Sequence, residues 1–343
     1  MLSTSSPSPT LSSPIVSRRT VLLAGAATAL AGCVAEMAPS GPRVDANRVQ
    51  DDAFVLSDGA RLPYRAWLPA DRAHTVVLAL HGFNESRDAW ELSAPSFAAA
   101  GIAFYAPDQR GFGASVSRGV WPGANRLADD AVEMARQVRR RHPAARLVLM
   151  GESMGGAVLL HMATSRDPPP ADYVLLAPAV WGRARMNLVL RSSLWLAANL
   201  LPGYKVTRAP VSVRVIPSDN QDALRSLSRN PLTLKGTRFD TLRGLVDLMD
   251  LALAAAPRFR ETALFLYGAN DDLVPKVATR AVWGELAGSD IRRSYYIDGY
   301  HLLFRDLKRA VPIGDTIAWI AARQLPLPSG ADKTAAAWLS GPA

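Results

Sequence analysis

The sequence predicts an α/β fold in which a doubly wound, mostly parallel sheet carries a helical cap insertion. Short runs that are apolar on both faces are typical of buried parallel strands, and helical segments alternate with them along the 343-residue chain. A Gly-x-Ser-x-Gly pentapeptide joins one such run to a helix at residues 151–155. This alternation favours a single α/β domain.

Six runs have the length and apolar pattern of strands. They cover residues 61–68, 75–80, 102–106, 146–150, 173–177 and 263–267. Helical segments are expected between them at residues 87–100, 125–141 and 154–165. Strands that alternate with helices in this way are typical of a doubly wound sheet.

The alternation stops between residues 181 and 260. One helix should separate the strand at 173–177 from the strand at 263–267, yet about 80 residues intervene. This segment contains apolar helical stretches at 188–201 and 242–255. An insertion of this size beyond the strand ends is expected to form a cap over a ligand site.

The N-terminal residues resemble a secretion signal. Arg18 and Arg19 precede a short apolar run that ends in Leu-Ala-Gly-Cys at residues 30–33. Two positive charges, an apolar stretch and a small-residue cleavage site are the layout of a signal peptide, and the run is too short for a stable membrane span. The Leu-Ala-Gly-Cys ending resembles a bacterial lipobox, which implies cleavage before Cys33 and lipidation of its thiol. The paired arginines resemble a twin-arginine export signal.

The chain is therefore expected to have four parts. These are a lipoprotein-type signal peptide (1–32), a polar tether (33–52), the α/β domain with its cap (53–325) and a loose C-terminal tail (326–343). The mature protein is expected to be exported and held at the membrane surface of the bacterial cell envelope by a lipid on Cys33. A plain signal peptide with an incidental cysteine is the alternative.

The basic charge does not indicate a nucleic-acid partner. The formal net charge is +9, and 34 of the 39 basic residues are arginines scattered among many alanines, which favours a compositional bias. No zinc-finger spacing or aromatic ribonucleoprotein pattern is present. The sequence also contains no metal cluster or nucleotide loop, so no cofactor is expected, and nothing in it fixes an oligomeric state.

Ser153 is the candidate nucleophile. It lies at the centre of Gly151-Glu152-Ser153-Met154-Gly155, between an apolar strand and a helix. The tight turn forces the serine into a strained conformation and needs glycines on either side, where side chains would collide. This arrangement presents the hydroxyl at the end of the sheet beside a helix N-terminus.

A serine hydroxyl needs a base to take its proton and an acid to orient that base. Of the five histidines, only His301 lies late in the chain, in a turn after an apolar strand. The base that serves a Gly-x-Ser-x-Gly serine is found at such a position, after the acid in the chain. His74 and His142 lie next to strand or helix ends, and His161 lies within the helix that follows Ser153. Asp271 and Asp272 both follow the strand at 263–267 and both qualify as the acid on spacing alone.

The oxyanion of an acyl-transfer reaction needs two backbone donors. One is the N–H of Met154, the residue after the nucleophile. The other is expected in the loop after the strand at 75–80, where the N–H of Phe83 is the best candidate. Each such donor contributes about 3 kcal/mol at the transition state. His81 and Gly82 are expected to shape this loop.

These motifs resemble the monoacylglycerol lipase and lysophospholipase branch of the α/β-hydrolases. The resemblance covers most of residues 54–323 and includes the His81-Gly82-Phe83 loop, the segment 108–115, the Gly151–Gly156 turn, and Asn230-Pro231-Leu232 in the cap. It implies the α/β-hydrolase fold and selects Asp271, three residues after Gly268, as the acid. Asp108 and Arg110 are expected to form a structural turn.

The expected activity is cleavage of a carboxylic ester, of a monoacylglycerol or lysophospholipid type, through an acyl-enzyme. An acyltransferase or an aminopeptidase with the same triad is the alternative, and a non-enzymatic lipid-binding lipoprotein is a third hypothesis. Apolar residues crowd one part of the cap, namely Met186, Leu188, Val189, Leu190, Leu194, Trp195, Leu196 and Leu200. They either guide an acyl chain or rest on lipid, or they pack the cap onto the body.

Overall fold

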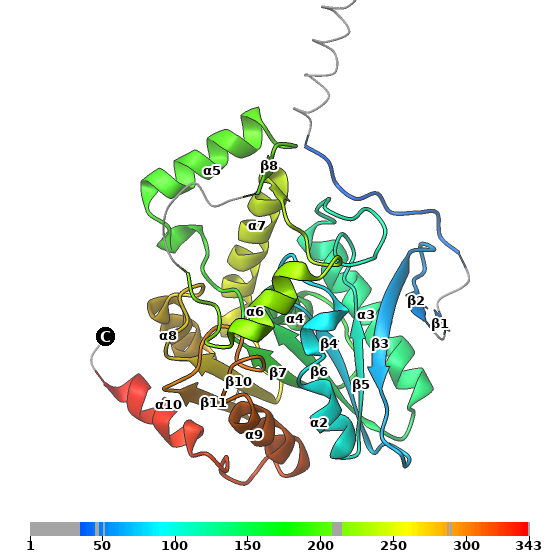
Figure 1. Ribbon diagram of the computed structural model, residues 1–343, viewed down its shortest axis with the longest axis vertical. Helices are drawn as coiled ribbons and strands as arrows, with labels where there is room; N and C mark the ends of the chain where they lie inside the picture. Colours follow the sequence, from blue (N-terminus) through cyan, green and yellow to red (C-terminus); the bar gives the residue numbers. More distant parts are fainter. Residues whose placement is uncertain are drawn as a thin grey trace, which may run out of the picture.

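The computed structural model describes residues 35–44, 48–50, 52–207, 215–286, 288 and 290–341. A nine-stranded sheet in the order β1-β2-β3-β5-β4-β6-β7-β10-β11 forms the centre of the molecule (Figure 1). The strands are β1 (Arg48–Val49), β2 (Ala53–Val55), β3 (Arg61–Trp67), β4 (Thr75–Leu80), β5 (Ile102–Pro107), β6 (Arg146–Glu152), β7 (Asp172–Leu176), β10 (Ala263–Gly268) and β11 (Ile291–Tyr296). The predicted α/β-hydrolase fold is therefore confirmed.

Six neighbouring strands, from β5 to β11, are parallel. The residues of β4, β5, β6, β7 and β10 are buried on both faces, which is why the sequence shows continuous apolar runs here. Strands β1, β2 and β3 add an antiparallel edge, and β3 pairs with β5. Because parallel strands end at one edge of the sheet, the turns after β4, β6, β10 and β11 meet there.

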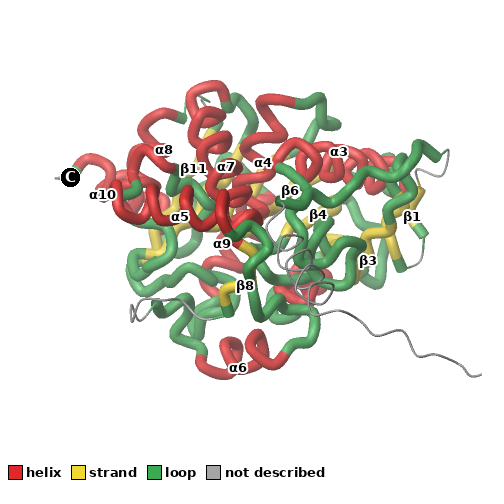
Figure 2. Tube along the Cα trace, turned by 90° about the horizontal axis from the view of Figure 1, so that it is seen from above, coloured by secondary structure: helices red, strands yellow, loops and turns green. Residues whose placement is uncertain are grey.

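Helices cover both faces of the sheet. One face packs against α3 (Ala124–Arg141), α4 (Met154–Ser165) and α8 (Lys276–Glu285). The other packs against η1 (Arg87–Trp90), α2 (Ala94–Ala99) and α9 (Ala310–Ala321). Figure 2 shows α8, α7 (Phe239–Ala255), α4 and α3 in a row on one side of the strands. The predicted segment 87–100 is thus two short helices rather than one.

The cap is inserted between β7 and β10, as predicted from the broken alternation. It contains η2 (Arg183–Arg185), α5 (Leu188–Leu200), β8 (Lys205–Val206), α6 (Gln221–Arg229), β9 (Thr237–Arg238), α7 (Phe239–Ala255) and η3 (Ala256–Arg258). Helix α7 packs on α4 and α5 packs on α7, so α5 lies farthest from the sheet (Figure 1). The sequence did not predict α6, a short and strongly amphipathic helix.

Of the two alternatives for the apolar residues of the cap, packing of α5 onto the body does not agree with the structure. Ala198 is the only residue of α5 that is fully buried. Most of the apolar side chains of this helix face solvent, and Leu188, Val189 and Trp195 are 71%, 76% and 63% exposed. These residues form an apolar surface on the outside of the cap.

The prediction of a loose tail from residue 326 is also wrong. Helix α10 (Ala331–Ser340) lies along the edge strand β11. The Trp338 ring stacks on Tyr295 at 4.6 Å between centroids, and Asp332 pairs with Arg292 of β11 at 2.9 Å. The Pro and Gly residues at the start of the tail led to the prediction of a loose segment. The helix after them is held by Trp338, whose aromatic contacts form only in the folded sheet.

The predicted tether also differs from a free linker. Ala38 is buried and its N–H donates to the Trp121 carbonyl at 3.0 Å, while Val44 N–H donates to Ser57. Residues 48–49 form β1. The domain therefore begins before residue 53. The predicted signal peptide and Cys33 lie outside the described residues, and within them no helix has the length and apolarity of a membrane span.

Candidate active site

Ser153 occupies a strained turn between β6 and α4. Its φ of 52° and ψ of −112° lie in the left-handed half of the backbone map, where L-residues are disfavoured. Three backbone hydrogen bonds hold it there: Ser153 N–H donates to Leu176 O at 2.9 Å, and its carbonyl accepts from Ala157 and Ala179. The side chain is partly exposed.

The glycines of the serine motif are required by close packing, as predicted. A Cβ on Gly151 would lie 2.5 Å from the Gly155 carbonyl carbon. A Cβ on Gly155 would lie 2.2 Å from the Leu80 carbonyl oxygen of β4. The pentapeptide therefore brings the nucleophile turn against the end of the neighbouring strand.

His301 and Asp271 form a buried pair beyond the ends of β11 and β10. His301 Nδ1 lies 2.8 Å from Asp271 Oδ2, and the two side chains are 3% and 0% exposed. The other oxygen, Oδ1, accepts the N–H groups of Leu273 and Val274 at 2.8 and 2.9 Å. These contacts fix the carboxylate in its turn.

Asp272, the alternative acid, lies apart from this pair. It is exposed, and its Oδ2 accepts the N–H of Ile216 in the cap at 3.3 Å. The geometry therefore selects Asp271 as the partner of His301.

The turns that carry Asp271 and His301 touch through two glycines. A Cβ on Gly268 would lie 2.5 Å from the carbonyl of Gly299. Asn270 N–H donates to the Gly299 carbonyl at 2.8 Å. This backbone contact brings the carboxylate within hydrogen-bond distance of the imidazole.

The environment of His301 favours its protonated form. Burial alone lowers the pKa of this imidazole, but the Asp271 carboxylate, helped by Glu152 and Glu85, outweighs burial and raises the pKa of His301 above its ordinary value. A base with a raised pKa is a stronger proton acceptor from a hydroxyl.

The serine and the histidine share one edge of the sheet but are not bonded to each other. Ser153 follows β6, and Asp271 and His301 follow β10 and β11, which lie in the same parallel array. In the part of the chain that the structure describes, no hydrogen bond joins the Ser153 hydroxyl to His301. Such bonds are often long in structures without substrate and shorten when one binds.

The loop after β4 lies against the serine. A Cβ on Gly82 would be 3.6 Å from the Ser153 Cβ, so the loop that carries Phe83 borders the hydroxyl. Neither the N–H of Phe83 nor that of Met154 has an acceptor among the described residues. Both donors are therefore available to a ligand.

His81 shapes this loop, as predicted. Its ring is fully buried; Nδ1 lies 2.7 Å from the Gly82 carbonyl, and Nε2 accepts the N–H of Gln109 at 3.0 Å. Burial lowers the pKa of His81, which favours the neutral ring that these two bonds require. His81 is thus a structural residue of the candidate site.

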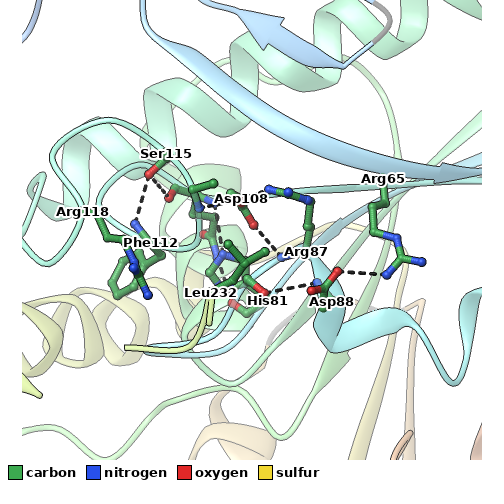
Figure 3. Close-up of polar contacts among 12 residues, drawn as sticks. Arg65, His81, Arg87, Asp88, Asp108, Phe112, Ser115, Arg118 and Leu232 are labelled. Atoms are coloured by element: carbon green, nitrogen blue, oxygen red, sulfur yellow. Dashed lines mark hydrogen bonds and ion pairs between the residues drawn. The ribbon is translucent and has the colours of Figure 1, made fainter. Parts of the chain in front are cut away.

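Asp108 and Arg110 are structural, as expected. The Asp108 carboxylate accepts hydrogen bonds from the N–H groups of Arg87 and Ala114 at 2.7 Å, and it forms an ion pair with the Arg87 guanidinium. Figure 3 shows this ion pair beside a neighbouring one between Arg65 and Asp88. Arg110 pairs with Asp130 at 2.7 Å and Asp58 at 2.9 Å. Asp108 thus ties the segment after β5 to η1, and Arg110 ties it to α3 and to the turn at Asp58.

Three buried charged residues beside the site were not singled out from the sequence. Arg305 pairs with Glu85, at 2.9 Å, and with Glu152. A charged residue inside an otherwise apolar run was the available signal, since Glu152 ends a buried strand and Arg305 follows Leu302-Leu303-Phe304. A cavity of about 480 Å³ lies between η1 and α6 and reaches Glu85 and Arg305.

The described residues contain no group of three or more His, Cys, Asp or Glu side chains arranged to hold a metal ion.

A strained serine beyond a central parallel strand and a buried histidine–aspartate pair at the same edge define an α/β-hydrolase. The chain belongs to the family described as serine aminopeptidase, S33, whose model matches residues 71–308.

Relatives with assigned activities are similar over most of their length. A monoacylglycerol lipase of Mycolicibacterium smegmatis is 25% identical over 79% of this chain and 97% of that protein. A monoglyceride lipase of Mus musculus is 24% identical over 79% of this chain and 90% of that protein.

Solved structures share the fold. A soluble variant of the Saccharomyces cerevisiae monoglyceride lipase has a TM-score of 0.66 at 18% identity and covers 82% of this chain and 98% of that one. The Paleococcus ferrophilus monoacylglycerol lipase has a TM-score of 0.64 at 19% identity, over 77% of this chain and 99% of that one. The protein is an ester hydrolase with the α/β-hydrolase fold.

Proposed function

We propose that the protein hydrolyses lipid esters of the monoacylglycerol or lysophospholipid type, with Ser153, His301 and Asp271 as its catalytic triad. The observation that carries this proposal is the buried 2.8 Å contact between His301 Nδ1 and Asp271 Oδ2 at the edge of the sheet where the strained Ser153 lies. A buried pair of this kind orients an imidazole so that its second nitrogen can act on a hydroxyl.

The reaction proceeds in two halves. His301 Nε2 takes the proton of the Ser153 hydroxyl as the oxygen attacks the ester carbonyl, and the N–H groups of Phe83 and Met154 stabilise the oxyanion. His301 then gives the proton to the leaving alcohol, which leaves an acyl group on Ser153. In the second half His301 takes a proton from water as the water oxygen attacks the acyl carbonyl. The bond to Ser153 Oγ then breaks, His301 returns the proton to that oxygen, and the fatty acid is released.

A lipid substrate is supported by the relatives and by the cap. The relatives that cover most of this chain are named monoacylglycerol or monoglyceride lipases. Helix α5 exposes Leu188, Val189, Trp195, Leu196 and Leu200 to solvent. An exposed apolar surface of this kind favours contact with an acyl chain or a lipid surface.

The aminopeptidase alternative is less favoured by the cap carboxylates. A peptidase that removes N-terminal residues needs acidic groups in the cap to bind the free amine. The five cap aspartates already have partners: Asp222 pairs with Arg225, Asp240 with Arg238, Asp247 and Asp250 with Arg183, and Asp219 accepts the N–H of Leu307. No observation favours the acyltransferase alternative.

Activity on esters of rising chain length tests the proposal. Protein lacking residues 1–32 is expected to hydrolyse p-nitrophenyl esters and 1-monoacylglycerols, with a preference for medium or long acyl chains. Ser153→Ala is expected to lower kcat by about 10⁴-fold or more, because it removes the nucleophile. Equal activity of the variant and the wild type would remove Ser153 from the reaction.

We also propose that the protein is exported and anchored in the cell envelope by a lipid on Cys33. The proposal rests on the Leu-Ala-Gly-Cys ending at residues 30–33 after a basic and apolar leader. Cys33→Ser is expected to move the protein from the membrane fraction to the soluble fraction of fractionated cells. Unchanged partitioning would contradict the anchor without bearing on the reaction.

A further inference from the structure

Arg305, Glu85 and Glu152 form a buried charged cluster next to the segments that carry Ser153 and His301. The Arg305 guanidinium contacts Glu85 twice, with Nη1 at 2.9 Å from Oε1 and Nη2 at 3.0 Å from Oε2, and Nη2 also contacts Glu152. Arg305, Glu85 and Glu152 are 5%, 7% and 1% exposed. Charges are seldom buried to this degree unless they are paired, because removing them from water is costly.

The three residues come from the three segments that the reaction needs. Glu85 lies two residues after Phe83, in the loop that supplies one oxyanion donor. Glu152 is the residue immediately before Ser153, and Arg305 lies four residues after His301. One guanidinium therefore joins the oxyanion loop, the nucleophile turn and the segment of the base.

Both backbone polar groups of Arg305, its N–H and its carbonyl, are also hydrogen-bonded. Its N–H donates to the Leu302 carbonyl at 2.7 Å, next to His301. Its carbonyl accepts the side-chain amide of Asn220, which caps α6, at 2.9 Å. The junction thus also connects the inner part of the cap to the segment of His301.

We propose that Arg305 is a positioning residue of the reaction: by binding Glu85 and Glu152 it holds the oxyanion loop and the nucleophile turn in place relative to His301. This inference rests on the proposed function. It assigns Arg305 no contact with substrate.

Arginine suits this position better than lysine. A planar guanidinium presents several N–H donors in a fixed fork, so it can bind two carboxylates at once in defined directions. A lysine ammonium keeps the positive charge but cannot reproduce the fork. Arg305→Lys therefore separates the directional role of the side chain from its charge.

The junction also contributes to the charge around His301. Three carboxylates act on this imidazole: Asp271 after β10, Glu152 at the end of β6 and Glu85 in the loop after β4. Arg305 and Asp306 are the charged groups on its own segment. Glu152 and Glu85 both raise the pKa of His301. Removing either carboxylate lowers the pKa of the imidazole, so the enzyme stays active to lower pH.

The first test compares two arginines with similar surroundings. Arg305→Lys is expected to lower kcat on a short p-nitrophenyl ester by about tenfold or more, with less than about a threefold change in KM, because misplaced donors and nucleophile impair the transition state. The control is Arg110→Lys, since Arg110 is equally buried between Asp58 and Asp130 but contacts none of the three segments through its side chain. It is expected to lower the melting temperature and leave kcat within about twofold.

The second test needs no change in side-chain shape. Glu85→Gln and Glu152→Gln each keep an oxygen acceptor for Arg305 and remove one charge. Each is expected to move the acidic limb of the kcat/KM–pH profile to lower pH, because one carboxylate that raises the pKa of His301 is lost. Each also weakens one of the bonds by which Arg305 holds its neighbours, so kcat is expected to fall by about threefold or more. A cluster that only stabilises the fold would lower the melting temperature and leave kcat unchanged, so the pair of glutamine variants carries the test even if Arg305→Lys fails to fold.

The outcomes separate this inference from the proposed function. A wild type without Ser153-dependent ester hydrolysis overturns both. If the wild type is active, the positioning role alone is contradicted when folded Arg305→Lys keeps the wild-type kcat, or when both glutamine variants keep it.

Discussion

At the scale of single residues, one carboxylate is distinguished from its neighbour by burial and hydrogen bonding. Asp271 and Asp272 are adjacent in sequence and equivalent in spacing from the preceding strand. Asp271 turns inward, where two backbone N–H groups and the His301 ring bind its oxygens, and Asp272 turns outward to the cap. The roles of these two acids should therefore differ sharply.

Asp271→Asn is expected to lower kcat by about 10³- to 10⁴-fold, because an amide cannot hold the imidazole in the tautomer that accepts the serine proton. Asp272→Asn is the matched control, and its exposed position predicts a change of less than about twofold. Steady-state kinetics of both purified variants on one ester would check this. Similar losses in the two variants would contradict the assignment of the acid.

The same carboxylate predicts the pH dependence of activity. In the proposed reaction neutral His301 is the proton acceptor, so kcat/KM is expected to fall as the pH drops through the pKa of the ring. Because Asp271 raises the pKa of His301, the midpoint of the acidic limb is expected above 6.5, the ordinary pKa of histidine. A midpoint well below 6.5 in the wild type would contradict this electrostatic interpretation.

The residues of the candidate site were predictable where local sequence determines their geometry. Ser153 sits in a pentapeptide whose glycines are needed at fixed offsets, and His301 was the one histidine in a late strand-end turn. Glu85 and Arg305 were not predictable, because their roles follow from an ion pair between residues 220 positions apart. Their apolar neighbours in sequence only marked them as unusual.

At the scale of elements, the site depends on how closely two turns approach. Gly268 ends β10, and Gly299 lies just before His301; their backbones touch, which leaves no room for a side chain on Gly268. Strand boundaries were predicted to within about two residues because both faces of β4, β5, β6 and β10 are buried. This contact between turns was not predicted, since nothing local specifies it.

Gly268→Ala is expected to separate the two turns, because its Cβ would lie 2.5 Å from backbone atoms of Gly299 and Tyr300. The expected result is a loss of about 2 kcal/mol in the free energy of unfolding and a fall in kcat as the Asp271–His301 contact lengthens. Chemical denaturation and ester hydrolysis would measure the two effects.

Gly314→Ala in α9 is the control for this substitution. A Cβ there meets nothing within 4 Å, so the free energy of unfolding should rise by about 0.5–1 kcal/mol, as for alanine in a helix, with unchanged kcat. An unchanged kcat in Gly268→Ala would show that the approach of the turns is not needed.

At the scale of the whole molecule, the C-terminal helix α10 packs along the edge strand β11 of the sheet. A parallel sheet leaves an open strand at its edge, and proteins commonly cover such edges. Here α10 covers β11 through the Trp338 ring, which packs on Tyr295 and Trp283. The composition of residues 326–330 suggested a loose tail, and only the assembled sheet provides the surface on which this helix folds.

Trp338→Ala is expected to lower the free energy of unfolding by about 2 kcal/mol, because a half-buried indole loses its aromatic contacts. Since α10 lies away from the triad, kcat at a temperature where the variant is folded should match the wild type. Thermal unfolding together with activity measurements would check both statements. A variant as stable as the wild type would show that the packing of Trp338 on β11 does not contribute to the free energy of unfolding.

The two parts of the cap are attached to the body very differently. The part around α6 is bonded to the body at three points: Asn230 to Asp88 at 2.9 Å, Leu234 N–H to the Asn84 carbonyl, and Asn220 to the Arg305 carbonyl. Helix α5 instead rests on α7 and buries only Ala198. Changes in the length or composition of α5 would leave all three of these bonds in place. The architecture thus separates the part of the cap that carries the exposed apolar surface from the part that is bonded to the loop of Phe83 and the segment of His301. The apolar surface can therefore change in shape and extent without disturbing the geometry at the edge of the sheet.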